Sequence, residues 1–522
     1  MLTYNFENID SPLYEHIYKC IKSDIVNGII KRGEKLPSKR AFAKNNGISS
    51  ITVENAYNQL ISEGYIYSLP RKGYYVSDNL IIRAYKRPSE NQNFKNQNPD
   101  NKNLENQNIN NQNLKNQYYK NQSIKNQNIN IEYRKIDNDE RENIYNKNSL
   151  YKNNLSNNSM PASGFPFSVW AKLMRETLSG NRENLMKPSP TGGIFELREA
   201  ISEHLRSFRG MSVHPSQIII GAGTEYLYGL LIQLLGRDKI YCIENPVYKK
   251  IPMIYEKNKV VYKYANMDEK GIIPVEIRNT EANIVHISTA HHFPTGITMP
   301  ASRRYEIISW ANEKEGRYII EDDYDSEFRY SGKPIPPLFA IDDSEKSIYI
   351  NTFSKSLAST MRISYMVLPR HLIDEFYREL SFYSCTVSNF EQYTLAKFIE
   401  RGYFDKHISR RRIHYSKKRQ EVLSRIFNNQ IAKKCEIIEN DSGLHFLIKL
   451  NTKMGDRELI EKLNKKGISI SALSEYYSKE KIKNKEKEED MHIFLVNYSN
   501  IDIKNLDEVL NIIYQIIDFD SI

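Results

Sequence analysis

A tract of asparagine, glutamine and lysine divides this chain and constrains its fold more than any other sequence feature. From about residue 91 to 130 the sequence begins NQNFKNQNPDNKNLENQNINNQNLKNQYYKNQ, with isolated apolar residues and a KNQ unit recurring near five-residue spacing. Such a segment buries too little apolar surface to offset the entropy lost on ordering. We therefore expect a flexible linker over 79–158 between separately folded domains. A short solenoid repeat is the alternative, but it needs a regular apolar stripe that the tract lacks.

The chain length also requires more than one domain. At 522 residues it is too long for one compact core, and its hydrophobic content of 40% is enough for globular packing elsewhere. We predict one domain over 1–78 and another over 159–522, the latter with a large part at about 190–395 and a small part at about 396–522.

The charge and the cysteine content indicate which binding partners and which cellular compartment to expect. The net charge of +10 favours polyanionic partners. Residues 79–155 hold 13 Lys and Arg against 8 Asp and Glu, so this arm adds either salt-sensitive attraction to phosphates or solubility alone. The four cysteines lack metal-ligand or redox spacing, and the N-terminus lacks a signal-peptide pattern. With no apolar run of about 18 residues, we expect a cytoplasmic protein outside the membrane.

Residues 11–77 show three helical patterns followed by a hairpin. Apolar side chains recur every fourth residue from position 13 to position 29, which predicts an amphipathic helix. Ser38 caps a second helix over 39–45, Gly47 supplies a turn, and Ser49 or Ser50 caps a third helix running to about residue 63. Two short helices joined by a Gly-containing turn indicate a helix-turn-helix. The sequence YIYSLPRKGYYVS then predicts two strands around a basic tip, a wing.

This arrangement predicts binding to double-stranded DNA. The third helix enters the major groove and presents its first residues to base edges, while basic side chains contact phosphates. The residues expected to contact DNA are Lys39, Arg40, Ser49, Ser50, Thr52, Asn55, Arg71 and Lys72. The alternative is a three-helix scaffold with no role in nucleic-acid binding.

The same segment resembles the GntR family of winged-helix regulators. The matching residues are PLYEHIYKCIKSDIVNGIIKRGEKLPSKRAFAKNNGISSITVENAYNQLISEGY, and the resemblance covers essentially all of 11–77. It implies an α+β winged helix that binds an operator. Ser50 stands where such proteins usually carry Arg, so no operator sequence is carried over.

From about residue 160 strand-like and helical segments alternate, which predicts an α/β domain with a largely parallel sheet. In RYIIEDDYDSEFRY a buried strand over 318–320 ends in acidic residues. In SIYINTFSKSL a second strand, over 347–350, runs into hydroxyls and a lysine. Open α/β sheets bind ligands at the carboxyl ends of their strands, so both clusters lie where a ligand is expected.

A lysine beside Ser and Thr, with Arg seven residues later, suits a phosphorylated aldehyde cofactor. The Lys355 amine forms a Schiff base, which needs a lowered pKa, and the hydroxyls and Arg362 bind the phosphate. An Asp facing the pyridine nitrogen keeps that nitrogen protonated. The sequence IIIGAGTEYLYGLLIQLLG predicts a Gly-rich turn whose amides face a phosphate. A plain loop lysine, and a solvated turn or Mg²⁺ site at EDDYD, are the alternatives.

The motifs IIEDDYDSEFRY, TFSKSL, HFPTG, TGGIFELREAI and IENPVY resemble the MocR/GabR family, in which a GntR winged helix precedes a fold-type I aminotransferase-like domain. The resemblance covers about 160–522 and implies pyridoxal 5'-phosphate as the cofactor. It implies that Lys355 forms the Schiff base, that Asp322 pairs with the pyridine nitrogen, with Asp323 as the alternative, and that Tyr324 contacts the ring hydroxyl. The other residues implied around the cofactor are Gly223, Thr224, Tyr248, Thr352, Ser354 and Arg362.

Three positions depart from that family. His292 stands where many members have Gln, and Lys250 stands where GABA-sensing members have Arg. Their second carboxylate-binding Arg is not evident, and His492 is the nearest candidate. Lys and His are poor substitutes for a bidentate Arg clamp, so we do not expect GABA to be the effector.

Together these patterns predict a cytoplasmic, pyridoxal phosphate-dependent transcription regulator. By resemblance it forms a head-to-tail homodimer, and its DNA binding changes when the cofactor, an amine or an amino acid favours one domain arrangement. Genes for vitamin B6 synthesis or amine metabolism are plausible targets. The rival is an aminotransferase with an accessory DNA-binding domain, expected to turn over weakly without a carboxylate clamp. A sensor of the cofactor alone is a third alternative.

Overall fold

The computed structural model describes residues 4, 13–26, 29–31, 33–62, 65–69, 73–77, 153–156, 161, 164–180, 182–330, 335–438, 443–478 and 492–519. The expected linker over 79–158 lies outside the described residues except for 153–156, so its predicted character stays a prediction. The tip of the wing, with Arg71 and Lys72, also lies outside them. The N-terminal region, residues 13–77, and the C-terminal region, residues 153–519, are described separately below.

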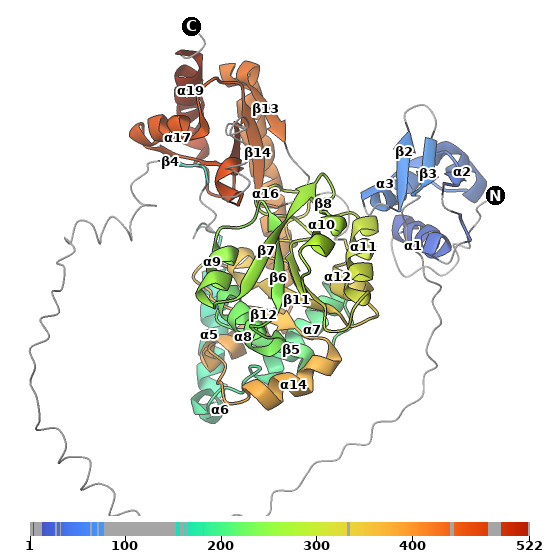
Figure 1. Cartoon of the computed structure of the whole chain (residues 1–522), viewed down its shortest axis with the longest axis vertical. Helices are drawn as coiled ribbons and strands as arrows, with labels where there is room; N and C mark the ends of the chain where they lie inside the picture. The colour runs from blue at the N-terminus through green and yellow to red at the C-terminus, as the bar shows by residue number, and fades with distance from the viewer. Residues whose placement is uncertain are drawn as a thin grey trace, which may run out of the picture. The chain divides into compact units, whose positions relative to one another are not determined.

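The described residues of the N-terminal region (blue in Figure 1) form three helices and a small antiparallel sheet. The helices are α1 (Leu13–Val26), α2 (Lys39–Asn46) and α3 (Ser50–Ser62), and the strands are β1 (Lys35–Leu36), β2 (Ile66–Leu69) and β3 (Gly73–Val76). Strands β2 and β3 form the predicted hairpin, and β1 pairs with the other side of β3. The winged helix-turn-helix is therefore confirmed, with one strand more than the sequence predicted.

Local sequence explains where these helices begin and end. The Ser38 hydroxyl accepts a hydrogen bond from the Ala41 amide at 3.2 Å, and Gly47, at a φ of +63°, ends α2 in the left-handed conformation. Helix α1 was expected to reach Ile29, but it ends at Val26 and Ile29 is 67% exposed. The Asn-Gly pair that follows Val26 has low helix propensity, which explains the earlier end. The fully buried residues of this core include Ile17, Ile21, Ile25, Val53, Ala56, Tyr57 and Leu60.

The C-terminal region is built on an eight-stranded sheet with strand order β5-β12-β11-β10-β9-β6-β7-β8. The strands are β5 (Ile218–Gly221), β6 (Ile240–Asn245), β7 (Val261–Asp268), β8 (Gly271–Ile272), β9 (Ile284–Ile287), β10 (Tyr318–Asp322), β11 (Ser347–Thr352) and β12 (Ser364–Val367). Strands β7, β6, β9, β10 and β11 run parallel, which confirms the largely parallel sheet. Strand β12 runs antiparallel to both β11 and β5.

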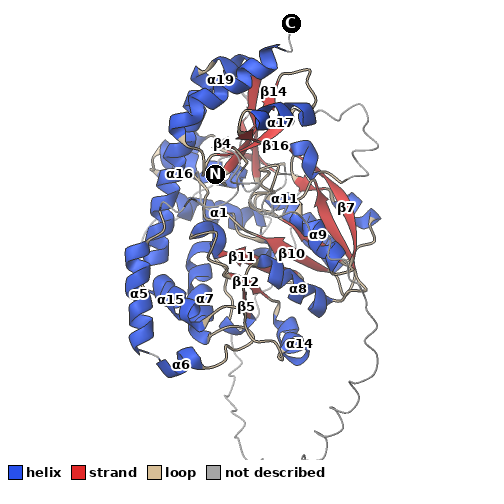
Figure 2. Ribbon diagram, turned by 90° about the vertical axis from the view of Figure 1, so that its left-hand side faces the viewer, coloured by secondary structure: helices blue, strands red, loops and turns tan. Residues whose placement is uncertain are grey.

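Helices cover both faces of this sheet (Figure 2). On one face Ile243, Ile284 and Ile320 pack with α8 (Thr224–Leu235), α9 (Lys250–Lys257) and α14 (Arg370–Leu380). Val285, which follows Ile284, and Ile319, which precedes Ile320, point to the opposite face. Because both faces of these strands are buried, their sequences are continuous apolar runs. The other helices of this part are α5 (Phe167–Gly180), α6 (Arg182–Met186), α7 (Phe195–Arg209), α10 (Pro274–Asn279), α11 (Ala301–Asn312), α12 (Leu338–Ile341), α13 (Phe353–Ser356) and α15 (Asn389–Glu400), with the 3₁₀ turn η1 (Pro215–Gln217).

The long helix α16 (Tyr403–Asn428) joins two hydrophobic cores. Its residues Phe404 and Ile408 pack in the core of α7 and α15, whereas Tyr415, Val422 and Ile426 pack in the core of the last part of the chain. That part holds the antiparallel sheet β13-β14-β17-β16. Its elements are η2 (Gln430–Lys434), β13 (Cys435–Ile438), β14 (His445–Leu450), α17 (Asp456–Lys465), β15 (Ile468–Ser469), β16 (Ser471–Ala472), η3 (Leu473–Tyr476), β17 (Ile493–Asn497) and α19 (Ile503–Phe519), and β4 (Asn153–Asn154) pairs with β15.

Candidate functional site

The carboxyl ends of two neighbouring parallel strands meet at a cavity of about 430 Å³. Strand β10 ends at Asp322 and β11 at Thr352, in the adjacent, parallel position. Both residues line the cavity, as the strand-end argument predicted. Eight of the nine residues predicted around the cofactor line it: Thr224, Tyr248, Asp322, Tyr324, Thr352, Ser354, Lys355 and Arg362. The ninth, Gly223, is the N-cap of α8, directly before Thr224.

Lys355 lies in α13, the short helix that directly follows β11. Burial lowers the pKa of its amine to about 8; Asp325 opposes this shift and Lys250 adds to it. The amine therefore loses its proton far more readily than an exposed lysine does, and the neutral form is the one that attacks a carbonyl carbon.

Asp322 presents one carboxylate oxygen without a hydrogen-bond partner among the described residues. The Tyr228 hydroxyl donates to its Oδ2 at 2.6 Å, whereas Oδ1 is buried and unpaired. Burial raises the pKa of Asp322 to about 7, although the bond from Tyr228 acts in the opposite direction. Burial also lowers the pKa of His286 to about 3, so this ring, 4.0 Å from Oδ2, is neutral. The site therefore leaves room for one further hydrogen-bond donor at Oδ1.

The neighbouring carboxylates point elsewhere. Asp323 pairs with Arg209 and accepts a hydrogen bond from the Tyr349 hydroxyl at 2.7 Å. Asp325 lies 2.9 Å from Nδ1 of His291. Of the two candidates Asp322 and Asp323, only Asp322 lines the cavity. Because the three carboxylates diverge, they do not form one metal site, and no group of three or more His, Cys, Asp or Glu within the described ranges is arranged to hold a metal ion.

Another part of the lining combines a helix start with hydroxyls and an arginine. Gly223 has a φ of +95°, and a Cβ added there would lie 2.2 Å from Nη2 of Arg362, so only glycine leaves space for this guanidinium. The Thr352 hydroxyl accepts from the Ser354 amide at 3.1 Å, and the Ser354 hydroxyl donates to the Met361 carbonyl at 2.8 Å. These bonds hold the loop that carries Lys355 and Arg362.

Sequence reasoning missed several residues of the cavity wall, among them Glu225, Tyr228 and Glu244. Tyr228 follows Thr224 by four residues on α8, so helical spacing from the Gly-rich turn would have indicated it. Glu244 stands near the end of β6, as Asp322 stands at the end of β10. Glu225 forms ion pairs with Arg362 and, at 3.2 Å, with Lys250, which no local pattern indicated.

Of the three residues that depart from the family pattern, two line the cavity and one does not. Lys250 and His292 line the cavity, and Nε2 of His292 lies 3.3 Å from Oε2 of Glu244. His492 does not line it; its Nδ1 lies 3.4 Å from Asp456, at the start of α17. His492, the nearest candidate for a second carboxylate-binding residue, therefore does not face this cavity, because directly before β17 it contacts another carboxylate instead.

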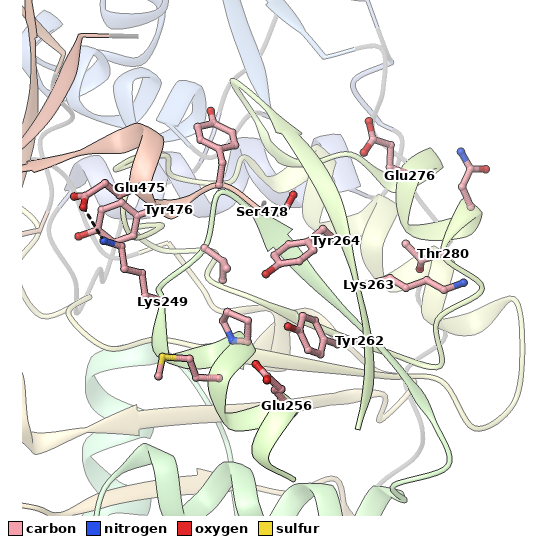
Figure 3. Close-up of a pocket in the computed structure, with 15 residues that line it drawn as sticks. Lys249, Glu256, Tyr262, Lys263, Tyr264, Glu276, Thr280, Glu475, Tyr476 and Ser478 are labelled. Carbon is pink, nitrogen blue, oxygen red and sulfur yellow. Dashed lines mark ion pairs between the residues drawn. The ribbon is translucent and has the colours of Figure 1, made fainter. Parts of the chain in front are cut away.

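A second, larger cavity of about 970 Å³ holds none of the predicted cofactor residues. Figure 3 shows Tyr262 and Tyr264 on one wall and Tyr476 on the other. Lys249 lies over the Tyr476 ring, 4.6 Å from its centroid, and 3.4 Å from Glu475. Its mixed lining offers no convergent set of reactive groups, so the smaller cavity is the candidate site.

The predicted DNA contacts surround the start of α3. Ser49, Ser50 and Asn55 are exposed there, Thr52 is half-buried, and Arg40 is exposed on α2. Nζ of Lys39 lies 2.5 Å from Oε1 of Glu54, so its charge is already paired within the region. Ser49 also accepts a hydrogen bond from the Ile51 amide at 3.2 Å. The two serines, Asn55 and Arg40 are the predicted contacts most open to a DNA duplex, while Arg71 and Lys72 lie outside the described residues.

None of the described helices combines the length and apolar character that a membrane crossing requires. Two family models match the chain. The model for aminotransferase class I and II covers residues 152–511, and the model for bacterial regulatory proteins of the gntR family covers residues 13–76.

Named relatives match between 57% and 90% of this chain. The HTH-type transcriptional regulator YdeL of Bacillus subtilis is 35% identical over 469 residues, which is 90% of each chain. The probable rhizopine catabolism regulatory protein MocR of Rhizobium meliloti is 25% identical over 90% of this chain and 88% of its own. The pyridoxine biosynthesis transcriptional regulator PdxR of Corynebacterium glutamicum is 30% identical over 57% of this chain and 64% of its own.

Solved structures share the fold of the C-terminal region. Pyrococcus horikoshii kynurenine aminotransferase superposes with a TM-score of 0.63 at 22% identity, covering 73% of this chain and 95% of its own. An archaeal alanine:glyoxylate aminotransferase gives 0.63 at 20% identity, covering 73% and 94%. With both family models matched in the expected order, the chain belongs to the MocR-type HTH transcriptional regulators, in which a GntR-type DNA-binding domain precedes an aminotransferase class I and II domain.

Proposed function

We propose that the cavity holds pyridoxal phosphate and that its occupancy controls DNA binding by the winged helix. The aminotransferase class I and II fold implies this cofactor, and the described residues fit it. The observation that carries the proposal is the pairing, in one cavity, of a buried lysine with a lowered pKa and a buried carboxylate oxygen without a partner. A protonated pyridine nitrogen would satisfy that oxygen.

Each end of the cofactor has a suitable set of residues. Lys355 would hold its aldehyde carbon covalently, and Asp322 would hold the ring nitrogen. The amides at the start of α8, the hydroxyls of Thr352 and Ser354, and Arg362 would bind the phosphate. When bound, the cofactor supplies an electrophilic carbon that exchanges between amines.

The chain's own groups set the protonation of this site. Burial makes the Lys355 amine lose its proton more readily, and the Tyr228 hydroxyl donates a hydrogen bond to Asp322 at 2.6 Å. Tyr324 and Tyr248 line the cavity, and Tyr248 forms an edge contact with Phe293 at 5.6 Å between ring centroids. We assign Tyr324 to the ring hydroxyl and Tyr248 to the ring face or to an effector.

As a regulator acting on DNA, the protein would work in the cytoplasm as a head-to-tail homodimer. An amine or amino acid that reacts at the cavity changes DNA affinity only if it favours one domain arrangement over another. The test uses the full chain, a duplex from upstream of its own gene, and a titration with pyridoxal phosphate followed by amines and amino acids. We expect cofactor binding to change DNA affinity several-fold. Equal DNA affinity at every cofactor and amine concentration would refute the coupling.

Transamination is the second candidate function, favoured by the presence of Lys355, Asp322 and Tyr324 in one cavity. Among the described residues of its lining, Arg362 is the only arginine, and it is assigned to the phosphate. A substrate carboxylate would depend on Lys250, which pairs with Glu225. We therefore expect slow amino-group exchange, measurable as keto-acid formation in single-turnover experiments with excess protein.

A further inference from the structure

A carboxylate occupies the phosphate end of the cavity. Glu225, in the first turn of α8, pairs through Oε2 with Arg362 and through Oε1 with Nζ of Lys250 at 3.2 Å. One acidic side chain therefore bridges both cations of the lining that lie at this end. The side chain of Glu225 is 35% exposed, so solvent only partly screens its charge.

Arg362, which forms the ion pair with Glu225, is also the arginine proposed to bind the cofactor phosphate. The guanidinium of Arg362 lies across the start of α8, so close to Gly223 that a Cβ there would meet it at 2.2 Å. Burial alone would raise the pKa of Glu225, but hydrogen bonds to its own backbone amide, Arg362 and Lys250 lower it overall, so the group is ionised at neutral pH. A phosphate dianion at the same amides must compete with this carboxylate for Arg362 and then lies beside a like charge.

We propose that Glu225 sets the affinity for pyridoxal phosphate by competing with the phosphate group for Arg362. This rests on the proposed function, because it assumes that the cofactor phosphate binds at the start of α8. This competition lowers the affinity for the cofactor, so the bound cofactor exchanges with free cofactor. Such a site changes occupancy with the free cofactor concentration instead of staying saturated, as a sensor requires.

The charge on Glu225 should matter for the phosphorylated ligand alone. The variant Glu225→Gln keeps the size of the side chain and its hydrogen-bonding ability but removes the charge. Pyridoxal lacks the phosphate and serves as the matched ligand, and Glu256→Gln, an exposed carboxylate on α9 that lines the second cavity, serves as the matched protein control. Equilibrium dialysis gives both dissociation constants, and thermal unfolding checks that the variants fold.

We expect Glu225→Gln to bind pyridoxal phosphate about tenfold more tightly, as for one like charge removed within ~10 Å at an effective dielectric constant near 20. Its affinity for pyridoxal should stay within about twofold of wild type, and Glu256→Gln should change neither. Unchanged affinity for pyridoxal phosphate in Glu225→Gln, or an equal gain for both ligands, overturns the inference alone. No pyridoxal phosphate binding by any of the three proteins overturns the proposed function, and the inference with it.

Discussion

The substitution Asp323→Asn should destabilise the aminotransferase-like domain without touching the cavity. Asp323 and Arg209 form an ion pair whose side chains are 1% and 3% exposed, and the Tyr349 hydroxyl donates to the same carboxylate oxygen at 2.7 Å. Nε of Arg209 has no partner among the described residues, so Asp323 supplies most of the compensation for a buried guanidinium. Removing one partner of a buried ion pair costs about 3–5 kcal/mol, because the other charge stays buried.

Urea unfolding followed by tryptophan fluorescence suits this measurement. The chain has two tryptophans, Trp170 and Trp310, and both belong to the C-terminal region, so the signal reports on that region alone. We expect Asp323→Asn to lower the free energy of unfolding by about 3–5 kcal/mol. The double variant Arg209→Met with Asp323→Leu should recover most of that loss, because an apolar pair leaves no buried charge.

The neighbouring Asp322→Asn is the matched control. It removes a carboxylate that is also buried but forms no ion pair with a lysine or arginine among the described residues, so the protein should be at least as stable as wild type at pH 8 while losing affinity for pyridoxal phosphate. A loss of less than about 1 kcal/mol for Asp323→Asn would refute the counter-ion role of this carboxylate. Equal loss in both variants would refute the different roles of the two aspartates.

Three further outcomes follow from the same contacts. Burial raises the pKa of Asp322 to about 7, so its ionisation opposes folding: its contribution is fully present below pH ~4 and is lost, by up to ~4 kcal/mol, as the pH rises to about 7. Asp322→Asn should remove that part of the pH dependence in urea unfolding, and an unchanged slope would contradict the shift. Lys355→Ala should abolish covalent retention of pyridoxal phosphate after borohydride reduction, measured by intact mass, and capture by wild type should become faster as the pH rises through about 8; a retained adduct in the variant would place the attachment elsewhere. Arg40→Ala should weaken binding to all duplexes equally and reduce the salt slope by about 1, whereas an unchanged slope would mean that Arg40 does not contact phosphate.

Local patterns in the sequence were enough to predict the helices and strands and most residues of the candidate site. Ser38, Gly47 and the apolar spacing of α3 predicted the helix-turn-helix, because caps, turns and helix faces depend on residues a few positions apart. Strand-end acids and the lysine after β11 predicted the cavity for a similar reason. Parallel neighbouring strands bring their carboxyl ends to one edge of the sheet, so residues thirty positions apart meet there.

Some side-chain roles depend on residues far away in the sequence, and only the tertiary structure determined them. The sequence favoured Asp322 but left Asp323 as an alternative, and Arg209, more than a hundred residues earlier, separates their roles by pairing with Asp323. Likewise, His492 contacts Asp456 instead of lining the cavity, and Arg362 pairs with Glu225, which lies 137 residues earlier in the chain. Spacing along the chain determined which residue types gather at the strand ends. The direction of each charged side chain, and hence which of them faces the cavity, was decided by the counter-ions that folding brings beside it.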